Sequence, residues 1–327
     1  MKAVVTGSSG HLGEALVRTL RAQGEAVTGL DLLPGAFTSV TGSITDRDLV
    51  RRSLAGASTV FHAATLHKPH VATHSRQQFV DTNVTGTLVL LEEARRAGVG
   101  AFIFTSTTST FGAALQPPPG APAAWITEEV TPVPKNIYGA TKTAAEDLCQ
   151  EFNRNEKLPC LILRTSRFFP EEDDSRAARE AFAGDNLKVN EFLNRRVELE
   201  DVVSAHLLAA AAAPRLRFGR YIISATTPFA ESDCAALRVD LPAVVRRYVP
   251  EYEAEYARRG WKLATSLDRV YVNDRARRDL QWEPKYDFRS LLALLRAGAE
   301  PRSALARQVG AKGYHRETFT EGPYPVA

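Results

Sequence analysis

Tyr138 and Lys142 stand four residues apart, and this pair is the strongest candidate for chemistry in the sequence. In a helix, side chains at this spacing lie on one face, so the phenol and the ammonium would be neighbours. A nearby positive charge stabilises a phenolate and lowers the tyrosine pKa from its free value of about 10. The pair predicts a general base that takes a proton from a hydroxyl, although alone it fits a surface helix pair equally well.

A run of hydroxyl side chains, residues 105–109, follows the apolar segment 102–104. The carboxyl ends of strands in an open parallel sheet are where such folds carry out their chemistry. A hydroxyl there could hydrogen-bond a reacting alcohol or alkoxide. Ordinary capping of a strand end by Ser and Thr is the alternative.

Three glycines spaced three apart, Gly7, Gly10 and Gly13, follow a predicted strand and open a predicted helix. The first allows a tight turn, the second lets the backbone approach a pyrophosphate, and the third lets the helix pack on the strand. The amino end of the helix favours the phosphate charge. Residues 6–13 therefore predict a dinucleotide site, with contacts from the intervening Ser9, His11 and Leu12 as well as the glycines.

Asp31 ends the next predicted strand, about 20 residues beyond the glycines. A carboxylate at this place accepts hydrogen bonds from the two hydroxyls of the adenosine ribose. No arginine follows directly to receive a 2′-phosphate, so the sequence favours NAD over NADP. An exposed aspartate in a turn is the alternative.

The first half of the chain alternates short apolar runs with longer amphipathic ones, which is typical of βαβ units. We expect strands at Lys2–Thr6, Ala26–Asp31, 59–63, 101–106 and 160–164, and helices beginning near His11, Thr45, Gln77 and Tyr138. The helix that runs through residues 79–97 should stop at Ala97-Gly98. The proline-rich segment 116–122 should form an exposed loop that could cover a pocket.

The fold class expected is α/β, a Rossmann-type doubly wound parallel sheet with a smaller C-terminal substrate-binding lobe. Residues 1–165 should form the NAD-binding domain and residues 166–327 mostly the substrate-binding lobe. A helix at about 200–213 and a strand at 220–224 could pack back on the sheet.

Bulk composition excludes several classes of function. The 327 residues carry 41 basic and 38 acidic side chains without a long run of one sign, which argues against nucleic acid as a partner. Cys149, Cys160 and Cys234 are scattered, which argues against disulfides and zinc and favours a cytoplasmic protein. The apolar stretches are too short for a signal peptide or a membrane span.

At this point the chain resembles the extended short-chain dehydrogenase/reductase superfamily, in its NAD-dependent epimerase/dehydratase family of the UDP-galactose 4-epimerase type. The resemblance rests on residues 6–13, Asp31, 42–46, 60–64, 83–87, 104–112, 138–142 and 200–203, which occur in family order. It implies an enzyme that uses NAD to oxidise a hydroxyl of a sugar-like substrate. It also implies a homodimer formed through paired helices.

The resemblance also assigns individual residues. The family's catalytic hydroxyl lies four residues before an aromatic-Gly pair, so Phe111-Gly112 points to Thr107, with Ser106 as the second choice. Lys142 would also reach the nicotinamide ribose. The remaining cofactor contacts would be Ser43 and Ile44 beside the adenine, Ala63, Ala64 and Thr65 along the pyrophosphate and ribose, and Asn83 under the loop.

Two departures from the family pattern bear on the reaction. Family members that dehydrate a sugar follow the catalytic Thr with Asp-Glu, whereas Thr108-Ser109 stands here and cannot exchange protons near neutral pH, so dehydration is disfavoured. Those that decarboxylate a uronic acid have a glutamate in this segment, where Ser109 stands. Arg167 occupies the place of an asparagine that binds the substrate diphosphate. An arginine fork there predicts an anionic substrate; a salt bridge to Glu171 or Glu172 is the alternative.

Basic side chains elsewhere also suggest substrate contacts. His67, Lys68, His70 and His74 crowd the loop after the third predicted strand, and we expect His67 to face the substrate rather than a metal. Arg195 is a further substrate candidate, with an exposed basic turn as its alternative. No metal site is predicted.

Three classes of function remain open. The chain would be a sugar epimerase, possibly acting on a nucleotide sugar, or a dehydrogenase of a sugar, sugar acid or related hydroxy compound. A regulator that binds NAD without catalysis is the third class, and the preserved Thr107, Tyr138 and Lys142 argue against it. No sequence motif separates the first two.

Overall fold

A seven-stranded parallel sheet in the order β3-β2-β1-β4-β5-β7-β8 forms the centre of the molecule. The structure is a computed structural model that describes residues 2–313, 315, 319, 322 and 324. This order is that of two βαβ halves that diverge from adjacent strands, β1 and β4, and it confirms the predicted Rossmann-type sheet. Ligands of such sheets bind where the order reverses, at the carboxyl ends of the strands.

The strands of the sheet are buried apolar runs, as expected of a parallel sheet covered on both faces. The five strands predicted in the first half are confirmed, whereas β3 in this sheet and β6 (Ala124–Ile126) outside it were missed. The bounds are β1 (Lys2–Thr6), β2 (Ala26–Asp31), β3 (Val40–Thr41), β4 (Thr59–His62), β5 (Ala101–Thr107), β7 (Cys160–Thr165) and β8 (Phe218–Ile223).

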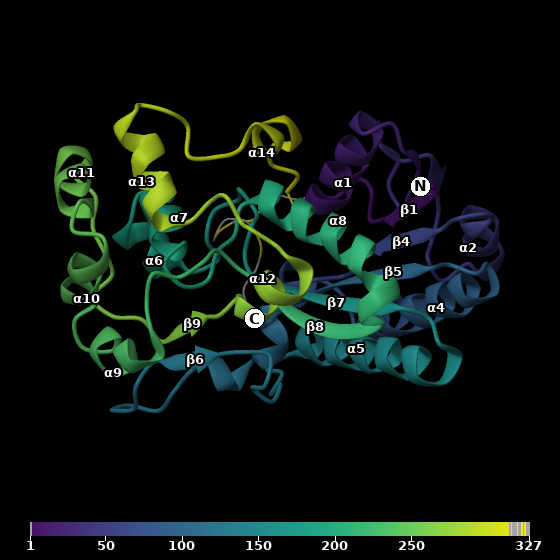
Figure 1. The fold of residues 1–327 in the computed structure, drawn as a ribbon, viewed down its shortest axis with the longest axis horizontal. Helices are drawn as coiled ribbons and strands as arrows, with labels where there is room; N and C mark the ends of the chain where they lie inside the picture. The colour runs from purple at the N-terminus through teal and green to yellow at the C-terminus, as the bar shows by residue number, and fades with distance from the viewer. Residues whose placement is uncertain (1, 314, 316–318, 320–321, 323, 325–327) are drawn as a thin grey trace.

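Helices cover both faces of the sheet (Figure 1). One face packs against α1 (His11–Ala22) and α8 (Leu199–Leu216) in a core of buried Leu, Val and Ala side chains. The other packs against α2 (Arg47–Leu54), α4 (Gly86–Arg96) and α5 (Ile137–Glu156). The predicted helix at 200–213 and strand at 220–224 thus belong to the sheet layer, and α12 (Asp274–Leu280) and α14 (Ala304–Val309) pack beside α8.

A smaller lobe with its own hydrophobic core lies beside the sheet, on the left of Figure 1. Its two-stranded parallel ladder joins β6 (Ala124–Ile126) to β9 (Arg269–Tyr271). Its helices are α6 (Arg176–Ala181), α7 (Gly184–Glu191), α9 (Cys234–Leu237), α10 (Leu241–Tyr248), α11 (Tyr252–Arg259) and α13 (Phe288–Arg296). The chain therefore passes between the sheet and the smaller lobe more than once. The domain ranges 1–165 and 166–327 stay a prediction, and parts of them lie outside the described residues.

The segment between β4 and β5 contains more than the single helix predicted from Gln77. A short α3 (Arg76–Phe79) continues through a π-helical turn, η2 (Val80–Thr85), into α4, which ends at Ala97-Gly98 as predicted. The short 3-10 turns of the chain are η1 (Lys68–His70), η3 (Thr108–Phe111), η4 (Ala113–Leu115) and η5 (Glu231–Asp233). Residues 116–122 form the irregular loop that the prolines predicted.

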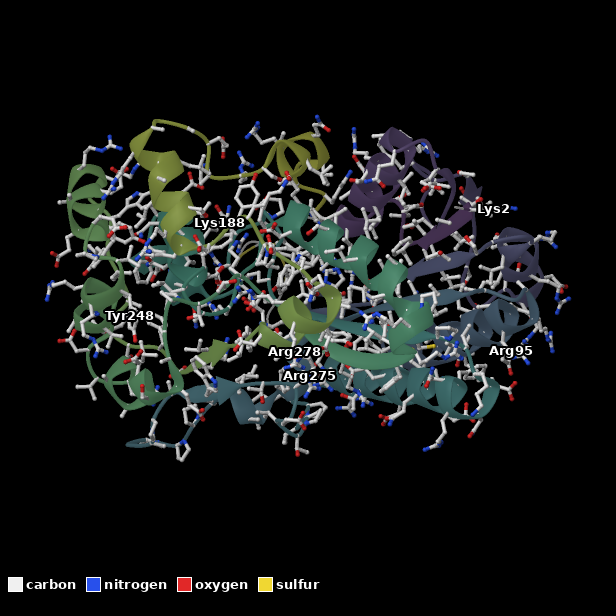
Figure 2. The ribbon with its side chains drawn as sticks, in the orientation of Figure 1. Lys2, Arg95, Lys188, Tyr248, Arg275 and Arg278 are labelled. Carbon is white, nitrogen blue, oxygen red and sulfur yellow. The ribbon has the colours of Figure 1, made fainter. Side chains whose placement is uncertain are left out.

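Charged side chains are spread around the outside of the molecule, and Lys2 and Arg95 lie at its right-hand side in Figure 2. Arg278 is 68% exposed and pairs with its neighbour Asp279. Among the helices of the described residues, none has the length and apolar character needed to cross a membrane.

Candidate active site

Two cavities lie at the carboxyl ends of the central strands. The first has a volume of about 370 Å³ and is lined by the glycine-rich loop, the end of β2 and the loop after β4. The second has a volume of about 320 Å³ and extends from η3 toward the smaller lobe. His67, Tyr138 and Thr165 line both. The two cavities therefore meet at Tyr138.

The glycine-rich loop has the geometry that a pyrophosphate requires. Gly7 has a φ of +74°, and a Cβ on it would lie 2.8 Å from the Ala64 backbone nitrogen. A Cβ on Gly13 would lie 1.9 Å from the Gly7 carbonyl oxygen, so only glycine lets α1 pack this closely on the turn. A Cβ on Gly10 would meet just that same carbonyl oxygen, at 3.3 Å. The space beside Gly10 thus stays open for a pyrophosphate, and the loop fits a dinucleotide.

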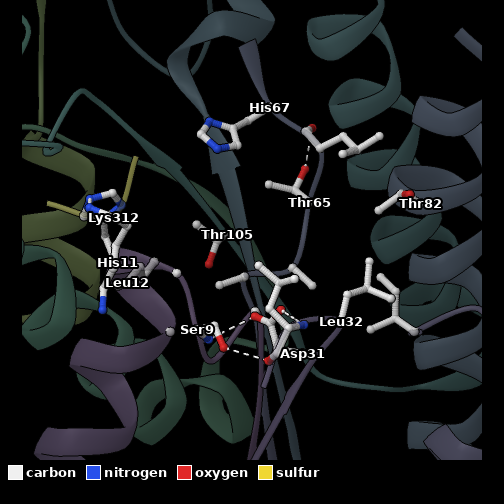
Figure 3. A pocket seen from close by; sticks show the side chains of 18 of the residues that line it. Ser9, His11, Leu12, Asp31, Leu32, Thr65, His67, Thr82, Thr105 and Lys312 are labelled. Carbon is white, nitrogen blue, oxygen red and sulfur yellow. Dashed lines mark hydrogen bonds between the residues drawn. The ribbon is translucent and has the colours of Figure 1, made fainter. Parts of the chain in front are cut away.

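The Asp31 carboxylate is held at the edge of the first cavity by two backbone amides. Its Oδ2 accepts from the Ser9 amide and its Oδ1 from the Leu33 amide, each at 2.9 Å. Figure 3 shows Asp31 and Ser9 joined in the lower part of the cavity, with His67 at the opposite end. Because each carboxylate oxygen can accept more than one hydrogen bond, both keep capacity for a ribose diol.

The residues predicted to bind the cofactor gather around the first cavity, with two exceptions. Its lining includes Gly7, Ser9, Gly10, His11, Leu12, Gly13, Asp31, Ser43, Ile44, Ala63, Ala64, Thr65 and Tyr138. Asn83 lies behind the lining, where its Oδ1 accepts from the Leu66 amide and from the Thr65 hydroxyl at 2.9 Å each. Its side-chain amide also donates to Thr141 of α5, which ties the loop after β4 to that helix. Lys142, the other exception, is buried beneath the lining, where it donates to the Thr105 carbonyl oxygen.

Thr107 and Tyr138 come together at the junction of the cavities. Asn136 caps the start of α5 by accepting from the Gly139 amide at 3.1 Å, and this fixes Tyr138 in the first turn. The Thr107 hydroxyl hydrogen-bonds with the Tyr138 phenol and also accepts from the Ser109 amide at 3.1 Å. Both side chains are buried among the described residues.

The expected lowering of the Tyr138 pKa by Lys142 is wrong for this geometry. Burial raises the pKa of Tyr138 to about 12, and the hydrogen bond with Thr107 opposes the rise only in part. The Lys142 ammonium instead donates to the Thr105 carbonyl oxygen at 2.6 Å and lies 3.9 Å from the centre of the Phe104 ring. Burial lowers the pKa of Lys142 to about 7, so this lysine is only partly charged near neutral pH.

Ser106, the second choice for the catalytic hydroxyl, is committed elsewhere. It donates to Glu146 at 2.6 Å, and Glu146 forms a buried ion pair with Arg164 at 2.7 Å. Thr107 contacts Tyr138, whereas Ser106 serves this buried pair. The geometry therefore favours Thr107 as the hydroxyl that faces a substrate.

Positively charged side chains dominate the second cavity. Its cations are Lys68, Lys135, Arg167, Arg195 and Arg269, and within its described lining Asp174 is the one carboxylate. His67 stacks on Phe169 with 5.6 Å between ring centres and lies 6.4 Å from the Tyr138 ring. Burial, followed by the nearby His70, holds the pKa of His67 well below its usual range, so its imidazole is neutral.

Arg167 forms salt bridges with two members of the acidic run 171–174 and with Glu191. It contacts Asp173, Glu191 at 3.4 Å and Asp174 at 3.5 Å, not Glu171 or Glu172. Burial opposes the charge of Arg167, and these carboxylates raise its pKa above the ordinary value. Arg195 shares the network, since it lies 2.7 Å from Glu191 and 3.8 Å from Asp173.

The histidines after β4 form a ring cluster. The centres of His67 and His70 are 4.8 Å apart and those of His70 and His74 are 5.0 Å apart. In the part of the chain that the structure describes, no three His, Cys, Asp or Glu side chains are arranged to hold a metal ion.

Comparison with known proteins assigns the family. The family model described as "NAD dependent epimerase/dehydratase family" matches residues 3–217. The chain belongs to this family. It is an enzyme family that depends on NAD, and NAD is the cofactor. The glycine-rich loop and Asp31 fit that cofactor, as the geometry above requires.

Relatives in the epimerase/dehydratase family differ in activity. The chain is 32% identical to a UDP-glucose 4-epimerase of Erwinia amylovora over 184 residues, 50% of this chain and 52% of that protein. It is 25% identical to a 3-beta-hydroxysteroid dehydrogenase of Mycolicibacterium neoaurum over 337 aligned positions, 89% of each chain. Matches to the first three curated relatives cover 40%, 52% and 45% of their lengths, so the chain spans about half of each.

Solved structures share the fold of this epimerase/dehydratase family member. A short-chain dehydrogenase/reductase superfamily protein of Agrobacterium tumefaciens with bound NAD matches with a TM-score of 0.64 and 24% identity, over 94% of this chain and 99% of that one. MoeE5 in complex with UDP-glucuronic acid and NAD matches with a TM-score of 0.64 and 21% identity, over the same shares of the two chains.

Sequence reasoning missed a segment near the C-terminus that completes the first cavity of this family member. Lys312 and Gly313 line that cavity, and their amides donate to Glu171 Oε1 at 2.9 and 3.1 Å. Glu171 also contacts His11 of the glycine-rich segment at 2.8 Å. Burial favours the neutral acid, but the hydrogen bond with His11 and the amides lower the pKa of Glu171 to about 2. No local motif marks residues 312–313, so no sequence signal could have identified them.

Proposed function

We propose that this chain is an NAD-dependent epimerase that oxidises and re-reduces a hydroxyl-bearing carbon of an anionic, sugar-like substrate. The observation that carries the proposal is the position of Tyr138, which lines both the cavity with the glycine-rich loop and the cavity with the basic lining. A substrate hydroxyl between the two cavities would lie next to both the phenol and the cofactor. Substrate and cofactor would thus be held in the contact that an oxidation requires.

The glycine-rich loop, Asp31 and the loop after β4 would hold the dinucleotide, with Asn83 fixing that last loop. When bound, NAD supplies the acceptor for a hydride from the substrate carbon, which an epimerase returns to the opposite face and a dehydrogenase leaves on released NADH. Lys142 would be held by its hydrogen bond to the Thr105 carbonyl oxygen.

Tyr138 would exchange a proton with the substrate hydroxyl, and Thr107 would orient that hydroxyl. The high pKa of Tyr138, about 12, favours the phenol as the resting form near neutral pH. A phenol in that form is suited to donate a proton back to the substrate oxygen on re-reduction. In the oxidation, the phenolate form of Tyr138 would accept the proton of the substrate hydroxyl and become the phenol, and the hydrogen bond from Thr107 would stabilise that phenolate beforehand.

The charges of the second cavity support an anionic substrate. Arg167, Arg195 and His67 all lie in its lining, together with further cations. A lining this rich in cations attracts carboxylates or phosphates and penalises a wholly apolar ligand. The complex of MoeE5 with UDP-glucuronic acid gives a precedent for an anionic sugar in this fold.

The test begins with the purified protein and its nucleotide content. We expect NAD to remain bound through purification, and we expect an anionic sugar, free or as a nucleotide sugar, to change configuration without net formation of NADH. Product analysis by NMR and NADH absorbance measure the two outcomes. Conversion of neutral sugars alone, or of none, would contradict the proposal.

A dehydrogenase is the second candidate, because the match to the 3-beta-hydroxysteroid dehydrogenase extends over 89% of both chains. The basic lining argues against a steroid, so a dehydrogenase built on this site would oxidise a sugar acid or related hydroxy compound. It would form NADH in proportion to product and exchange it for NAD. The same assay therefore separates the two candidates.

A homodimer through paired helices and a cytoplasmic location both stay predictions. Light scattering of the purified protein would measure its mass in solution, and a mass of one chain would contradict the dimer.

A further inference from the structure

Two buried polar atoms in the second cavity lack a hydrogen-bond partner in the described part of the chain. They are the hydroxyl oxygen of Ser166 and the Nε of Arg269. Both residues line the second cavity. Buried polar atoms are nearly always paired, so an unpaired atom facing a cavity indicates a place where a ligand supplies the partner.

The fold positions Arg269 from the smaller lobe. It begins β9, where it pairs in register with Ala124 of β6. Its carbonyl oxygen accepts from the Asn194 side chain at 2.9 Å, and Asn194 in turn accepts from the Tyr271 amide at 3.0 Å. These two contacts with Asn194 hold both ends of β9 against the turn after α7. The guanidinium therefore projects from a rigid support.

Ser166 comes from the sheet. It follows the last residue of β7, and its amide donates to the Ile223 carbonyl oxygen of β8 at 2.9 Å. Its side chain is only 3% exposed. Arg269 thus reaches the second cavity from the smaller lobe, and Ser166 reaches it from the sheet.

The other cations of the second cavity already have protein partners. Arg167 and Arg195 contact Glu191, Lys68 contacts Asp174, and Lys135 contacts the Gln116 side chain. Among the described residues, no carboxylate lies within salt-bridge distance of Arg269, and its guanidinium carbon lies 5.9 Å from the centre of the Tyr271 ring. Of the three arginines in this lining, Arg269 is thus the one without a carboxylate partner in the described part of the chain.

We propose that Arg269, together with the Ser166 hydroxyl, binds the oxyanion of the substrate, a carboxylate or a phosphate. A guanidinium donates two parallel hydrogen bonds to either group, and a hydroxyl adds a third donor. This assignment rests on the proposed function, because it names the charged group of the same substrate. The main contact with the substrate's charged group is therefore assigned to Arg269 of β9. Arg167, the residue expected from the sequence, already has its charge compensated by three carboxylates.

The test measures binding rather than turnover, so that it does not depend on the reaction. Titration calorimetry with the NAD-loaded protein uses two probes, glucuronate as a free carboxylate and UDP as a diphosphate. We expect at least one probe to bind and Arg269→Gln to weaken it by about 10-fold or more, with NAD affinity unchanged. Arg278→Gln, an exposed arginine nine residues further along the chain, is the matched control and should leave both affinities unchanged.

Ser166→Ala supplies a second variant that separates binding from folding. Because its hydroxyl has no partner among the described residues, alanine should leave the melting temperature unchanged or raise it, while the affinity for the same probe falls by a few-fold. A lower melting temperature with unchanged affinity would mean that the hydroxyl serves the fold, and would overturn its part in the site.

The outcomes distinguish the two proposals. Loss of glucuronate affinity in Arg269→Gln identifies a carboxylate, and loss of UDP affinity identifies a phosphate. Equal affinities of Arg269→Gln and the unaltered protein, or no binding of either probe, would overturn the inference even if the Tyr138 chemistry is found. Conversely, binding that depends on Arg269 without any sugar conversion would refute the proposed function and leave the anion site in place.

Discussion

Replacing Lys142 with methionine should stabilise the protein at neutral pH while it impairs activity. Burial lowers the folded-state pKa of Lys142 from 10.5 to about 7. The folded protein therefore binds this proton more weakly than the unfolded chain does. As pH falls from 10.5 toward 7 the unfolded chain gains the proton first, so the folded form loses stability over this window. Methionine keeps much of the side-chain volume and does not titrate there.

The magnitude follows from the size of that shift. A difference of about 3.5 pH units at about 1.4 kcal/mol each sets an upper bound of about 5 kcal/mol on the cost of the lysine below pH 7. Methionine gives up the hydrogen bond to Thr105 and the contact with the Phe104 ring, which offsets about 2 kcal/mol. The net gain at pH 7 should therefore be at most about 3 kcal/mol, and it should shrink by up to about 2 kcal/mol at pH 8.5 because the unaltered protein recovers stability.

Urea unfolding at the two pH values, after removal of bound nucleotide, measures the effect. Lys262→Met is the control, because Lys262 is exposed and its replacement should change stability by little at either pH. An unchanged or lower free energy of unfolding for Lys142→Met at pH 7 would refute the reasoning. A gain of the same size at both pH values would also refute it, because the pH dependence is what identifies the titration of Lys142.

Four further substitutions test the candidate site. Tyr138→Phe should lower the rate by at least about 100-fold and leave NAD affinity nearly intact, as measured by turnover and nucleotide titration; equal turnover would mean that the site is misplaced. Asp31→Ala should narrow the preference for NAD over NADP, and equally tight binding of both nucleotides by the unaltered protein would contradict the role of Asp31. Thr107→Ala should lower kcat by about 10-fold or more without loss of melting temperature, whereas Ser106→Ala should lower stability by about 1–2 kcal/mol because Ser106 serves the buried Glu146 pair. The reverse pattern would exchange the roles of Thr107 and Ser106.

The parts of the fold that depend on local sequence could be predicted. β1 and β7 are short apolar runs that a parallel sheet buries on both faces, and their positions follow from composition alone. The turn at Gly7 requires a positive φ and the packing at Gly13 leaves no room for a Cβ, so both positions mark the cofactor loop in the sequence. The spacing of Tyr138 and Lys142 likewise gave the correct helix.

Features that depend on distant contacts could not be predicted. The strands β6 and β9 are three residues each and lie far apart along the chain, so no periodicity reveals that Arg269 faces a cavity. The members of the acidic run 171–174 that pair with Arg167, and its contact with Glu191, could not be assigned, because sequence proximity does not specify which side chains a turn brings together. The pKa of Tyr138 was misjudged for a related reason, since charge spacing is visible in a sequence and depth of burial is not.

The contact of Lys312 and Gly313 with Glu171 also orders events during biosynthesis. The seven strands of the sheet are complete once residue 223 has been made, and a nascent chain could fold them while synthesis continues. The wall of the first cavity formed by residues 312–313 is added later, after nearly all of the smaller lobe has emerged. The ribosome-bound protein would therefore have the glycine-rich loop in place before it can enclose a nucleotide. Tight retention of NAD would then be a property that the chain acquires late in its synthesis, after the sheet has formed.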